Sequence, residues 1–399
     1  MDINTFILKY VVKREQSLFA QDILDNRSQL YEKIKDKSVL VIGGAGSIGS
    51  SFIKQILPYE PKTLVVVDIN ENGLAELTRD IRSTDGLYIP QDYVTYPMDY
   101  ASKVFEKMFV NRGGFDIVAN FSAHKHVRSE KDVYSIEALL RNNVLSLKKL
   151  LDLMVNFPPE EYFCVSTDKA ANPVNIMGAS KRMMEDLIFL YSDRFPVKTA
   201  RFANVAFSNG SLPAGFLERI SKHQPLSAPK DVKRYFVSLE ESGQICMLAG
   251  ILGNNREIFY PKLKETQMMS FDSIATNLLK EYGYMPVECS SDEQALHMMK
   301  DIEKDKYPVH YSVSDTSGEK EYEEFFVDGE VIDEKRFLAL GVIVGKEIPN
   351  RKKLEGLCDR LEQEFASLKT SKENIVDILE DYLPNFKHIE TGKSLDGKM

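Results

Sequence analysis

Cysteine is scarce in this chain, which holds four among 399 residues. Cys164, Cys246, Cys289 and Cys358 are widely spaced, and none belongs to a CxxC pair. Zinc sites and disulfide frameworks both need cysteines at matched spacings. The sequence therefore indicates neither a metal site nor a disulfide framework, and it favours a reducing, cytoplasmic location.

Long apolar runs and an excess of positive charge are also missing. No stretch approaches the roughly 18 apolar residues of a membrane-spanning helix, and the first residues lack the pattern of a signal peptide. The net charge of -9 disfavours nucleic acid and anionic membranes as partners, because basic faces bind both. We expect a cytoplasmic protein without a membrane span, in which a local basic pocket can still bind a small anion.

Short β-branched segments alternate with helical patterns from residue 38 onwards. Six such segments, each followed by a longer amphipathic or polar stretch, are SVLVIGG, KTLVVVD, YVTYPMD, DIVANFS, EYFCVST and VKTARFAN. This order is typical of βαβ units, which build a parallel sheet covered by helices on both faces. The sequence predicts an α/β fold with a doubly wound parallel sheet.

A glycine-rich turn follows the first predicted strand. Gly43, Gly46 and Gly49 have the spacing GxxGxxG, and Ser47 and Ile48 begin the next predicted helix. Glycine permits a tight turn and lets backbone amides approach a pyrophosphate, whose charge then lies at the positive end of the helix. The turn predicts a dinucleotide-binding (Rossmann) domain, and a turn without a ligand is the alternative.

Asp68 ends the second predicted strand, 19 residues after Gly49. A carboxylate at this position can accept hydrogen bonds from both hydroxyls of an adenosine ribose, and it repels the additional phosphate of NADP. The next three residues provide no arginine for that phosphate, so we expect NAD rather than NADP. Asp99 ends the third predicted strand, where it either contacts the adenine or is a solvated acid.

The chain divides into four expected regions. An N-terminal helical extension (1–36) precedes the NAD-binding Rossmann domain (37–205), to which a later segment at about 235–262 returns. Prolines interrupt the alternation after residue 205, so residues 206–345 are the expected smaller substrate-binding region. The last region, 346–399, is a charged helical tail. Its apolar stripe consists of Leu354, Leu357, Leu361 and Phe365.

Polar residues gather after two neighbouring predicted strands. NFSAHKHVRSEKD follows the fourth strand and STDKAANPVNIMGASK follows the fifth. In a doubly wound sheet, ligands bind at the carboxyl ends of the strands. The active site is therefore expected between these two segments.

Several blocks of the sequence resemble one family. STDKAANPVNIMGASKRMMEDL is similar to the signature of the CapD-like nucleotide-sugar N-acetylglucosamine 4,6-dehydratases, which belong to the extended short-chain dehydrogenase/reductase superfamily. GGAGSIGS, FSAHKHV, RFANVAFSNGSLPAGF, DVKRYFVSLEESGQ, EIFYPKL and SGEKEYEEF resemble further blocks in the same order. The resemblance covers about residues 38–326. It implies an NAD-dependent lyase that acts on a nucleotide sugar in polysaccharide biosynthesis.

In 4,6-dehydration, hydride leaves C4 of the sugar, a base removes the C5 proton, an acid protonates the departing C6 hydroxyl, and hydride returns to C6. By resemblance, Thr167 binds O4, Asp168 is the acid and Lys169 is the base. Lys181 holds the nicotinamide ribose, and as a nearby cation it is expected to lower the pKa of Lys169. An ordinary loop ion pair between Asp168 and Lys169 is the alternative.

The block FSAHKHV supplies further implied binding residues. Ala123 is implied in cofactor binding, and Lys125 and His126 line the nicotinamide and sugar side of the pocket. His126 receives no proton-transfer role, because a lone loop histidine is more often a structural hydrogen-bonding residue. Asn143 either supports this loop or makes a polar contact inside a helix.

Four residues are implied as contacts of the substrate: Met177, Asn204, Arg234 and Glu319. Asn204, Arg234 and Glu319 lie in blocks that face the nucleotide half. The forked guanidinium of an arginine suits a diphosphate, so Arg234 is the first choice for that role.

Met177 replaces the tyrosine of the YxxxK pattern that is typical of the wider superfamily. Long, membrane-anchored family members share this methionine and are thought to retain the configuration at C5, so retention is expected. The group that accepts the C4 hydroxyl proton stays open. UDP is the expected nucleotide, and GDP stays open because the sequence diverges from the family after residue 262.

Related dehydrogenases pair through the helices after the fourth and fifth strands, so we expect a homodimer or a higher homo-oligomer. Two other functions remain as alternatives. A C4 epimerase usually needs the missing tyrosine and has no use for a base such as Lys169. A non-catalytic NAD-binding sensor or scaffold would not need Thr167, Asp168 and Lys169 together.

Overall fold

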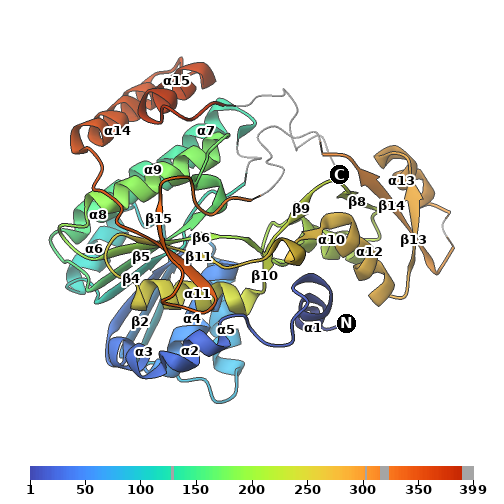
Figure 1. The fold of residues 1–399 in the computed structure, drawn as a ribbon, viewed down its shortest axis with the longest axis horizontal. Coiled ribbons are helices and arrows are strands. Elements are labelled where there is room, and N and C mark those ends of the chain that lie inside the picture. The colour runs from blue at the N-terminus through green and yellow to red at the C-terminus, as the bar shows by residue number, and fades with distance from the viewer. Residues whose placement is uncertain (127–129, 302, 315–322, 389–399) are drawn as a thin grey trace.

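The computed structural model describes residues 1–126, 130–301, 303–314 and 323–388, and within these a nine-stranded sheet forms the centre of the larger domain (Figure 1). Its parallel strands are β1 (Ser38–Ile42), β2 (Thr63–Asp68), β3 (Asp92–Pro97), β4 (Ile117–Asn120), β5 (Glu161–Thr167), β6 (Val197–Phe202) and β11 (Glu257–Pro261). Two antiparallel strands, β16 (Leu340–Val344) and β15 (Val331–Asp333), extend one edge. The sheet order is β15-β16-β11-β6-β5-β4-β1-β2-β3. The predicted doubly wound α/β fold is confirmed, and each of the six predicted segments overlaps a strand.

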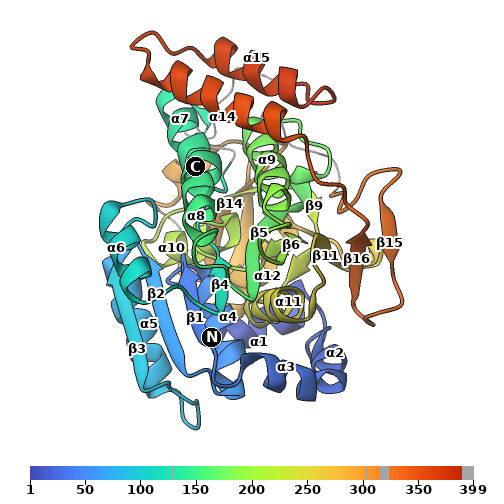
Figure 2. The ribbon, with the colours of Figure 1, turned by 90° about the vertical axis from the view of Figure 1, so that its left-hand side faces the viewer.

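Helices cover both faces of this sheet, so its central strands are buried on both sides. One face carries α2 (Ala20–Asp25), α3 (Arg27–Ile34), α4 (Ser47–Ile56), α5 (Glu71–Ser83) and α11 (Leu239–Leu252). The other carries α6 (Lys103–Asn111), α7 (Val133–Leu140), α8 (Leu147–Met154) and α9 (Ile176–Leu190) (Figure 2). Helix α11 packs directly against α4, so the segment at 235–262 returns to the sheet domain.

A second domain lies beside the sheet domain (Figure 1). Its described part has a three-stranded parallel sheet of β13 (Met285–Cys289), β14 (Lys306–Ser312) and β8 (Leu226–Pro229). Its helices are α10 (Leu212–Ser221), α12 (Phe271–Glu281) and α13 (Asp292–Met298). Two short pairs, β7 (Asn204–Val205) with β10 (Phe236–Val237) and β9 (Lys233–Arg234) with β12 (Met269–Ser270), lie where the chain passes between the domains. A hydrophobic core of its own includes Phe216, Leu226, Ile274, Leu278 and Val309.

The N-terminal extension contacts both domains of the same chain. Helix α1 (Ile3–Phe6) and the π-helical segment η1 (Ile7–Val11) bury apolar side chains in the core of the second domain. Helices α2 and α3, by contrast, contribute to the core of the sheet domain. Between them, Arg14 donates two hydrogen bonds to the buried carboxylate of Glu241 on α11. The extension therefore joins the two domains along one edge.

Residues 331–344 differ from the expected division of the chain. We assigned them to the substrate-binding region, but β16 pairs with β11 along the register Ile258↔Ile343 to Pro261↔Leu340 and so belongs to the main sheet. The following tail forms two helices, α14 (Arg351–Ala366) and α15 (Lys372–Tyr382), which lie over α7 and α9 (Figure 2). The predicted apolar stripe of α14 is buried.

Arg201 forms a buried ion-pair network at the centre of the sheet domain. Its side chain is fully buried, and it donates two hydrogen bonds to Glu185 on α9, of 2.9 and 2.8 Å. It also contacts Glu330, at 3.0 Å, and the backbone oxygen of Phe325, at 2.8 Å. Ser166 donates to the same Glu185 carboxylate. This network connects β5, β6, α9 and the segment that leads to β15.

We predict that Arg201→Leu lowers the free energy of unfolding by about 3–5 kcal/mol, because it leaves the buried charge of Glu185 without its main partner. Urea denaturation measures this change. The matched control is Arg79→Leu, at an exposed arginine that pairs with Glu76 on α5, and it should change the free energy by no more than about 0.5 kcal/mol. Equal effects of the two variants would contradict the prediction.

Candidate active site

The glycine turn packs too closely for larger side chains. Gly43 has a φ of +74°, and a Cβ there would lie 2.7 Å from the backbone nitrogen of Ser122. Gly46 directly precedes the first residue of α4, Ser47, so the amides of this ten-residue helix begin at the turn. Gly49 also approaches the backbone of Gly43. These features fit a pyrophosphate held at the N-terminus of α4.

The carboxylate of Asp68 lies against the same turn. It accepts hydrogen bonds from the backbone amides of Ala45, at 3.0 Å, and Asn70, at 2.9 Å. This places an acceptor for a ribose at the end of β2, beside the glycine turn. Asp99 is exposed after β3, where it accepts a hydrogen bond from the amide of Ala101 in the turn before α6.

The loop after β4 is clamped by a buried asparagine. The side chain of Asn143 accepts from the amide of His124 and donates to its carbonyl oxygen, both at 2.9 Å, and it also donates to the hydroxyl of Ser180 on α9. Of the two roles that the sequence left open for Asn143, the contacts favour loop support. Ala123 is partly buried directly before this clamp.

Lys125 and His126 are exposed at the end of the same loop. His126 faces the second domain, since a Cβ on Gly210 would lie 2.9 Å from its Nε2 atom. The neighbouring amide of Asn209 donates to the hydroxyl of Ser47. Residues 209–210 therefore lie beside both the glycine turn and the loop after β4.

The end of β5 brings together the three predicted catalytic residues. Thr167 is the last residue of the strand, and Asp168 begins the 3-10 turn η5 (Asp168–Ala170). The hydroxyl of Thr167 donates to Oδ1 of Asp168 at 2.7 Å, and Nζ of Lys169 lies 3.2 Å from both carboxylate oxygens. Asp168 is buried, whereas 28% of the Lys169 side chain is exposed.

The electrostatics of Lys169 differ from the sequence prediction. Burial by itself lowers the pKa of Lys169, but the negative charges of Asp168 and Glu323 outweigh it, so the pKa is raised above its usual value. Lys181, which we expected to lower it, instead directs Nζ to the backbone oxygen of Val165, at 3.0 Å. The expected direction was therefore wrong. Burial lowers the pKa of Lys181 itself.

The junction between the domains provides the residues that lie opposite the triplet. Arg234 is buried and donates to the backbone oxygen of Lys233, and its charge acts on both Lys169 and Glu323. Asn204 donates its side-chain amide to Glu323. The structure thus brings the predicted Asn204 and Arg234 close to the catalytic triplet. Glu319 lies outside the described residues.

Glu323 is a site residue that the sequence analysis did not single out. One of its carboxylate oxygens accepts from Asn204 and the other accepts from the backbone amide of Tyr235, at 2.8 Å. Burial, together with the charge of Asp168, raises the pKa of Glu323 to about 8. Asn204 is 119 positions away in sequence, so no local spacing indicated this contact. The sequence feature that could have indicated Glu323 is its position within SGEKEYEEF, one of the blocks that resemble the family.

Met177 is buried in the first turn of α9. Its backbone amide donates to the side chain of Glu130, at 2.9 Å, and Asn175 caps the helix by accepting from the amide of Gly178. A thioether has no proton to transfer. Proton chemistry in this part of the site must therefore come from other residues.

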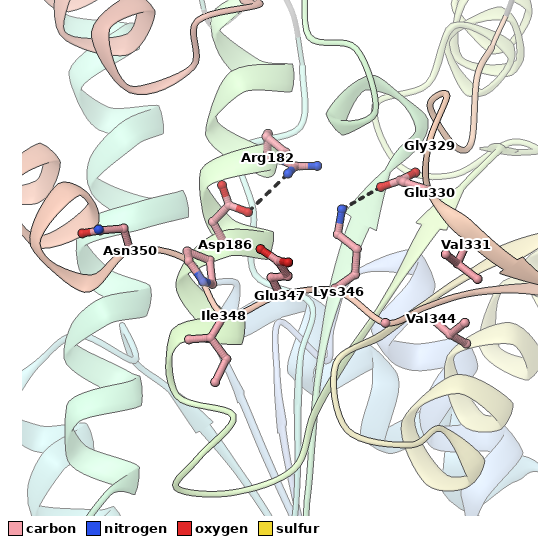
Figure 3. Close-up of a pocket in the computed structure, with 12 residues that line it drawn as sticks. Arg182, Asp186, Gly329, Glu330, Val331, Val344, Lys346, Glu347, Ile348 and Asn350 are labelled. Carbon is pink, nitrogen blue, oxygen red and sulfur yellow. Dashed lines mark hydrogen bonds and ion pairs between the residues drawn. The ribbon is translucent and has the colours of Figure 1, made fainter.

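A cavity of about 540 Å³ lies on the outer side of α9 and is lined by twelve residues, none of which is a predicted site residue (Figure 3). Arg182 pairs with Asp186 along the helix, at 3.5 Å, and Lys346 pairs with Glu330, at 2.8 Å. Glu330 also contacts Arg201. The charges around this cavity thus form part of the network that attaches the segment around β15 and β16 to α9.

Taken together, the doubly wound sheet, the glycine turn and the Thr-Asp-Lys triplet beside a second domain define an extended short-chain dehydrogenase/reductase. The family described as "Polysaccharide biosynthesis protein" matches residues 39–343, and the chain belongs to this family. This match confirms the CapD-like resemblance of the sequence.

Individual relatives agree with this family. An uncharacterised membrane protein of Methanocaldococcus jannaschii is 29% identical over 356 residues, which are 87% of this chain and 96% of that protein. The capsular polysaccharide biosynthesis protein CapD of Staphylococcus aureus is 28% identical over 63% of this chain, which spans only 42% of CapD. The inverting UDP-N-acetylglucosamine 4,6-dehydratase of Campylobacter jejuni is 26% identical over 61% of this chain and 72% of its own length.

Solved structures show the same fold. The structure of Pen from Bacillus thuringiensis aligns with a TM-score of 0.63 and 20% identity, over 82% of this chain and 98% of Pen. WbmF of Bordetella bronchiseptica, solved in complex with NADH, aligns with a TM-score of 0.51 and 17% identity, over 63% and 80% of the two chains. In the described ranges of the present structure, none of the helices has both the length and the apolar character needed to cross a bilayer.

We predict that Glu323 makes stability depend on pH. An ordinary glutamate has a pKa of 4.5, whereas that of Glu323 is raised to about 8. Between these values the folded state binds more protons than the unfolded state, so the free energy of unfolding falls as the pH rises. Urea denaturation from pH 5 to pH 8 should show a smaller fall for Glu323→Gln than for the wild type. Parallel curves for the two proteins would contradict this prediction.

Proposed function

We propose that the protein catalyses the NAD-dependent 4,6-dehydration of a nucleotide-activated N-acetylglucosamine, with UDP as the nucleotide and with retention at C5. The product would be a 4-keto-6-deoxy sugar for cell-surface glycan synthesis. The observation that supports this most is the hydrogen-bonded Thr167-Asp168-Lys169 triplet at the end of β5. The relatives from polysaccharide biosynthesis and the Campylobacter dehydratase support the same reaction class.

The glycine turn, Asp68 and Lys181 are the residues that would hold the cofactor. NAD, when bound, takes hydride from C4 and returns it to C6. Asp68 would accept both ribose hydroxyls, and its negative charge disfavours the phosphate of NADP. Ala123 and the clamped loop after β4 would border the nicotinamide side.

Proton transfer begins at O4 in this proposal. Thr167 already donates to Asp168, so a sugar O4 hydroxyl that donates to Thr167 completes a relay. As hydride leaves C4, the O4 proton passes to Thr167 and the proton of Thr167 passes to Asp168. Asp168 then carries the proton that it later gives to the departing C6 hydroxyl. This relay supplies an acceptor for the C4 hydroxyl proton.

The same step prepares Lys169 to act as a base. The charge of Asp168 is the largest contribution that raises the pKa of Lys169, and this charge disappears when Asp168 is protonated. Lys169 then loses a proton to solvent through its exposed part and can remove the proton from C5. After elimination, the same amine returns a proton to C5 from the same face, which retains the configuration. Oxidation at C4 thus precedes and enables removal of the C5 proton.

We predict that the protein converts UDP-N-acetylglucosamine to the 4-keto-6-deoxy product. NMR in heavy water should show deuterium at C5, because the ammonium group of Lys169 exchanges with solvent, and the C5 configuration should be retained. Lys169→Met and Asp168→Asn should each lower kcat by a factor of about 100 or more. GDP-N-acetylglucosamine is assayed in parallel to establish the nucleotide.

The matched control for this assay is Lys222→Met, at an exposed lysine of the second domain that pairs with Glu218, and it should retain wild-type kcat. Formation of the C4 epimer without deuterium at C5 would show an epimerase instead. Absence of turnover with both nucleotide sugars would refute the dehydratase assignment, and unchanged activity of Lys169→Met would refute the role of the lysine.

We also predict that Asp68→Ala weakens NADH binding about tenfold or more, because it removes charge-assisted hydrogen bonds to the ribose. Discrimination between NADH and NADPH should fall at the same time. Fluorescence titration of protein freed of bound nucleotide measures both affinities. Asp85→Ala, at a surface residue in the loop after α5, should bind both cofactors like the wild type. An Asp68→Ala variant with wild-type affinities would exclude the ribose contact.

A further inference from the structure

Glu323 is a buried carboxylate whose side chain contacts two separate parts of the chain. It is 9% exposed. Its side chain accepts from Asn204 on β7 and from the backbone amide of Tyr235, between β9 and β10. Both contacts are with the junction between the domains. Glu323 therefore connects Asn204 and Tyr235, two residues of the junction between the domains, on the side of the site opposite the triplet.

Four charged groups act together at this place. Glu323 interacts electrostatically with Asp168, Lys169 and Arg234, and Lys169 interacts with the other three. Two carboxylates and two cations thus share a site in which Asp168, Arg234 and Glu323 are buried. In such surroundings, the ionisation of one group changes the proton affinity of the others strongly.

The main chain after Glu323 is fixed independently of substrate. Arg201 donates to the backbone oxygen of Phe325, and the ring of Phe325 stacks on that of Tyr260 at 5.9 Å. The adjacent Glu324 accepts from Asn172, in the loop between η5 and α9. Glu323 is thus held at a defined position relative to β5 and α9, the elements that carry the triplet.

We propose that Glu323 is a positioning residue of the active site, which orients Asn204 and Tyr235 and, when ionised, keeps Lys169 protonated. The catalytic consequence rests on the proposed function, because it takes Lys169 as the base at C5. A second anion beside Lys169 opposes the proton loss that makes it a base, even after Asp168 has been neutralised. Burial and the charge of Asp168 raise the pKa of Glu323 to about 8, so its negative charge, which raises the pKa of Lys169, develops as the pH rises through this value. Ionisation of Glu323 then limits activity on the alkaline side.

The test measures the proton affinity of Lys169 directly and needs no turnover. Acetic anhydride acylates neutral amines, so trace labelling at pH 9, quantified by peptide mass spectrometry, reports the neutral fraction of Lys169. Labelling is normalised to that of the exposed Lys222. Glu323→Gln should raise the labelling of Lys169 by about threefold or more, which corresponds to a fall of half a pKa unit or more. Glu76→Gln, the same change at an exposed glutamate on α5, should leave it unchanged.

Two further variants test the same coupling between Glu323 and Lys169. Glu323→Asp retains the charge and should return labelling towards the wild-type level. If Glu323→Gln does not fold, Asn204→Ala replaces it, because loss of the amide donor keeps Glu323 protonated to higher pH and should also raise labelling of Lys169. Wild-type labelling of Lys169 in the folded Glu323→Gln or Asn204→Ala protein would overturn the inference.

Kinetics then separate this inference from the proposed function. In the wild type, kcat should fall above about pH 8, and this fall should shift to higher pH in Glu323→Gln but not in Glu76→Gln. An identical alkaline limb in Glu323→Gln and the wild type would overturn the catalytic part of the inference. Altered labelling in a protein that dehydrates neither nucleotide sugar would support the charge coupling while refuting the dehydratase assignment.

Discussion

The pairing of Arg201 with Glu185 is the interaction on which the active-site end of the sheet depends. Arg201 is on β6 and Glu185 is on α9, two elements that flank β5 and its catalytic turn. Both side chains are buried, so each charge needs the other. Ser166, directly before Thr167, donates to the same carboxylate. The ion pair therefore fixes the strand that carries Thr167 relative to the helix that carries Lys181.

The guanidinium of Arg201 also contacts the segment on the opposite side of the site, which contains Glu323. By donating to the backbone oxygen of Phe325, Arg201 positions the segment that contains Glu323. One buried cation thus relates the triplet on β5 to the carboxylate that faces it, although the two are far apart in sequence. Glu330 and Lys346 continue the network towards β15 and β16.

Local signals in the sequence were sufficient for most of the sheet domain. The β-branched segments predicted the parallel strands, and the glycine spacing predicted the turn that now lies beside Asp68. The triplet was found because it follows the fifth predicted strand, within the block that resembles the signature of the CapD-like family. Glu323 was missed because its partners are Asn204 and Tyr235, and no spacing in the sequence relates positions so far apart.

Two other differences have similar physical causes. The sequence shows that Lys181 is near Lys169 in the chain, but it does not show that α9 directs Nζ of Lys181 to the backbone of β5. Strand β16 was missed because its partner β11 is far away in the sequence, and β15 was missed because it is short and partly exposed, with Val331 64% exposed. Such an edge strand lacks the buried run that identified the central strands. β15 pairs with β16, and β16 pairs with β11, so the place of both strands in the sheet depends on the long-range contact between β16 and β11.

In the proposed mechanism, the replacement of tyrosine by Met177 divides the chemistry between two elements. In the YxxxK pattern, one helix supplies both the group that moves a proton and the lysine that holds the cofactor. Here the helix keeps Lys181, while Met177 is buried and offers only its backbone amide, to Glu130. The hydroxyl that can polarise O4 belongs instead to Thr167, at the end of the strand, and is already bonded to Asp168. In the proposed mechanism, the acid Asp168 and the base Lys169 are neighbours on one turn, so protonation of Asp168 would directly change the basicity of Lys169. If a tyrosine on the helix accepted the O4 proton, Asp168 would not be protonated in that step and the basicity of Lys169 would not change. In the proposed mechanism, the adjacent triplet couples acceptance of the O4 proton to the basicity of Lys169.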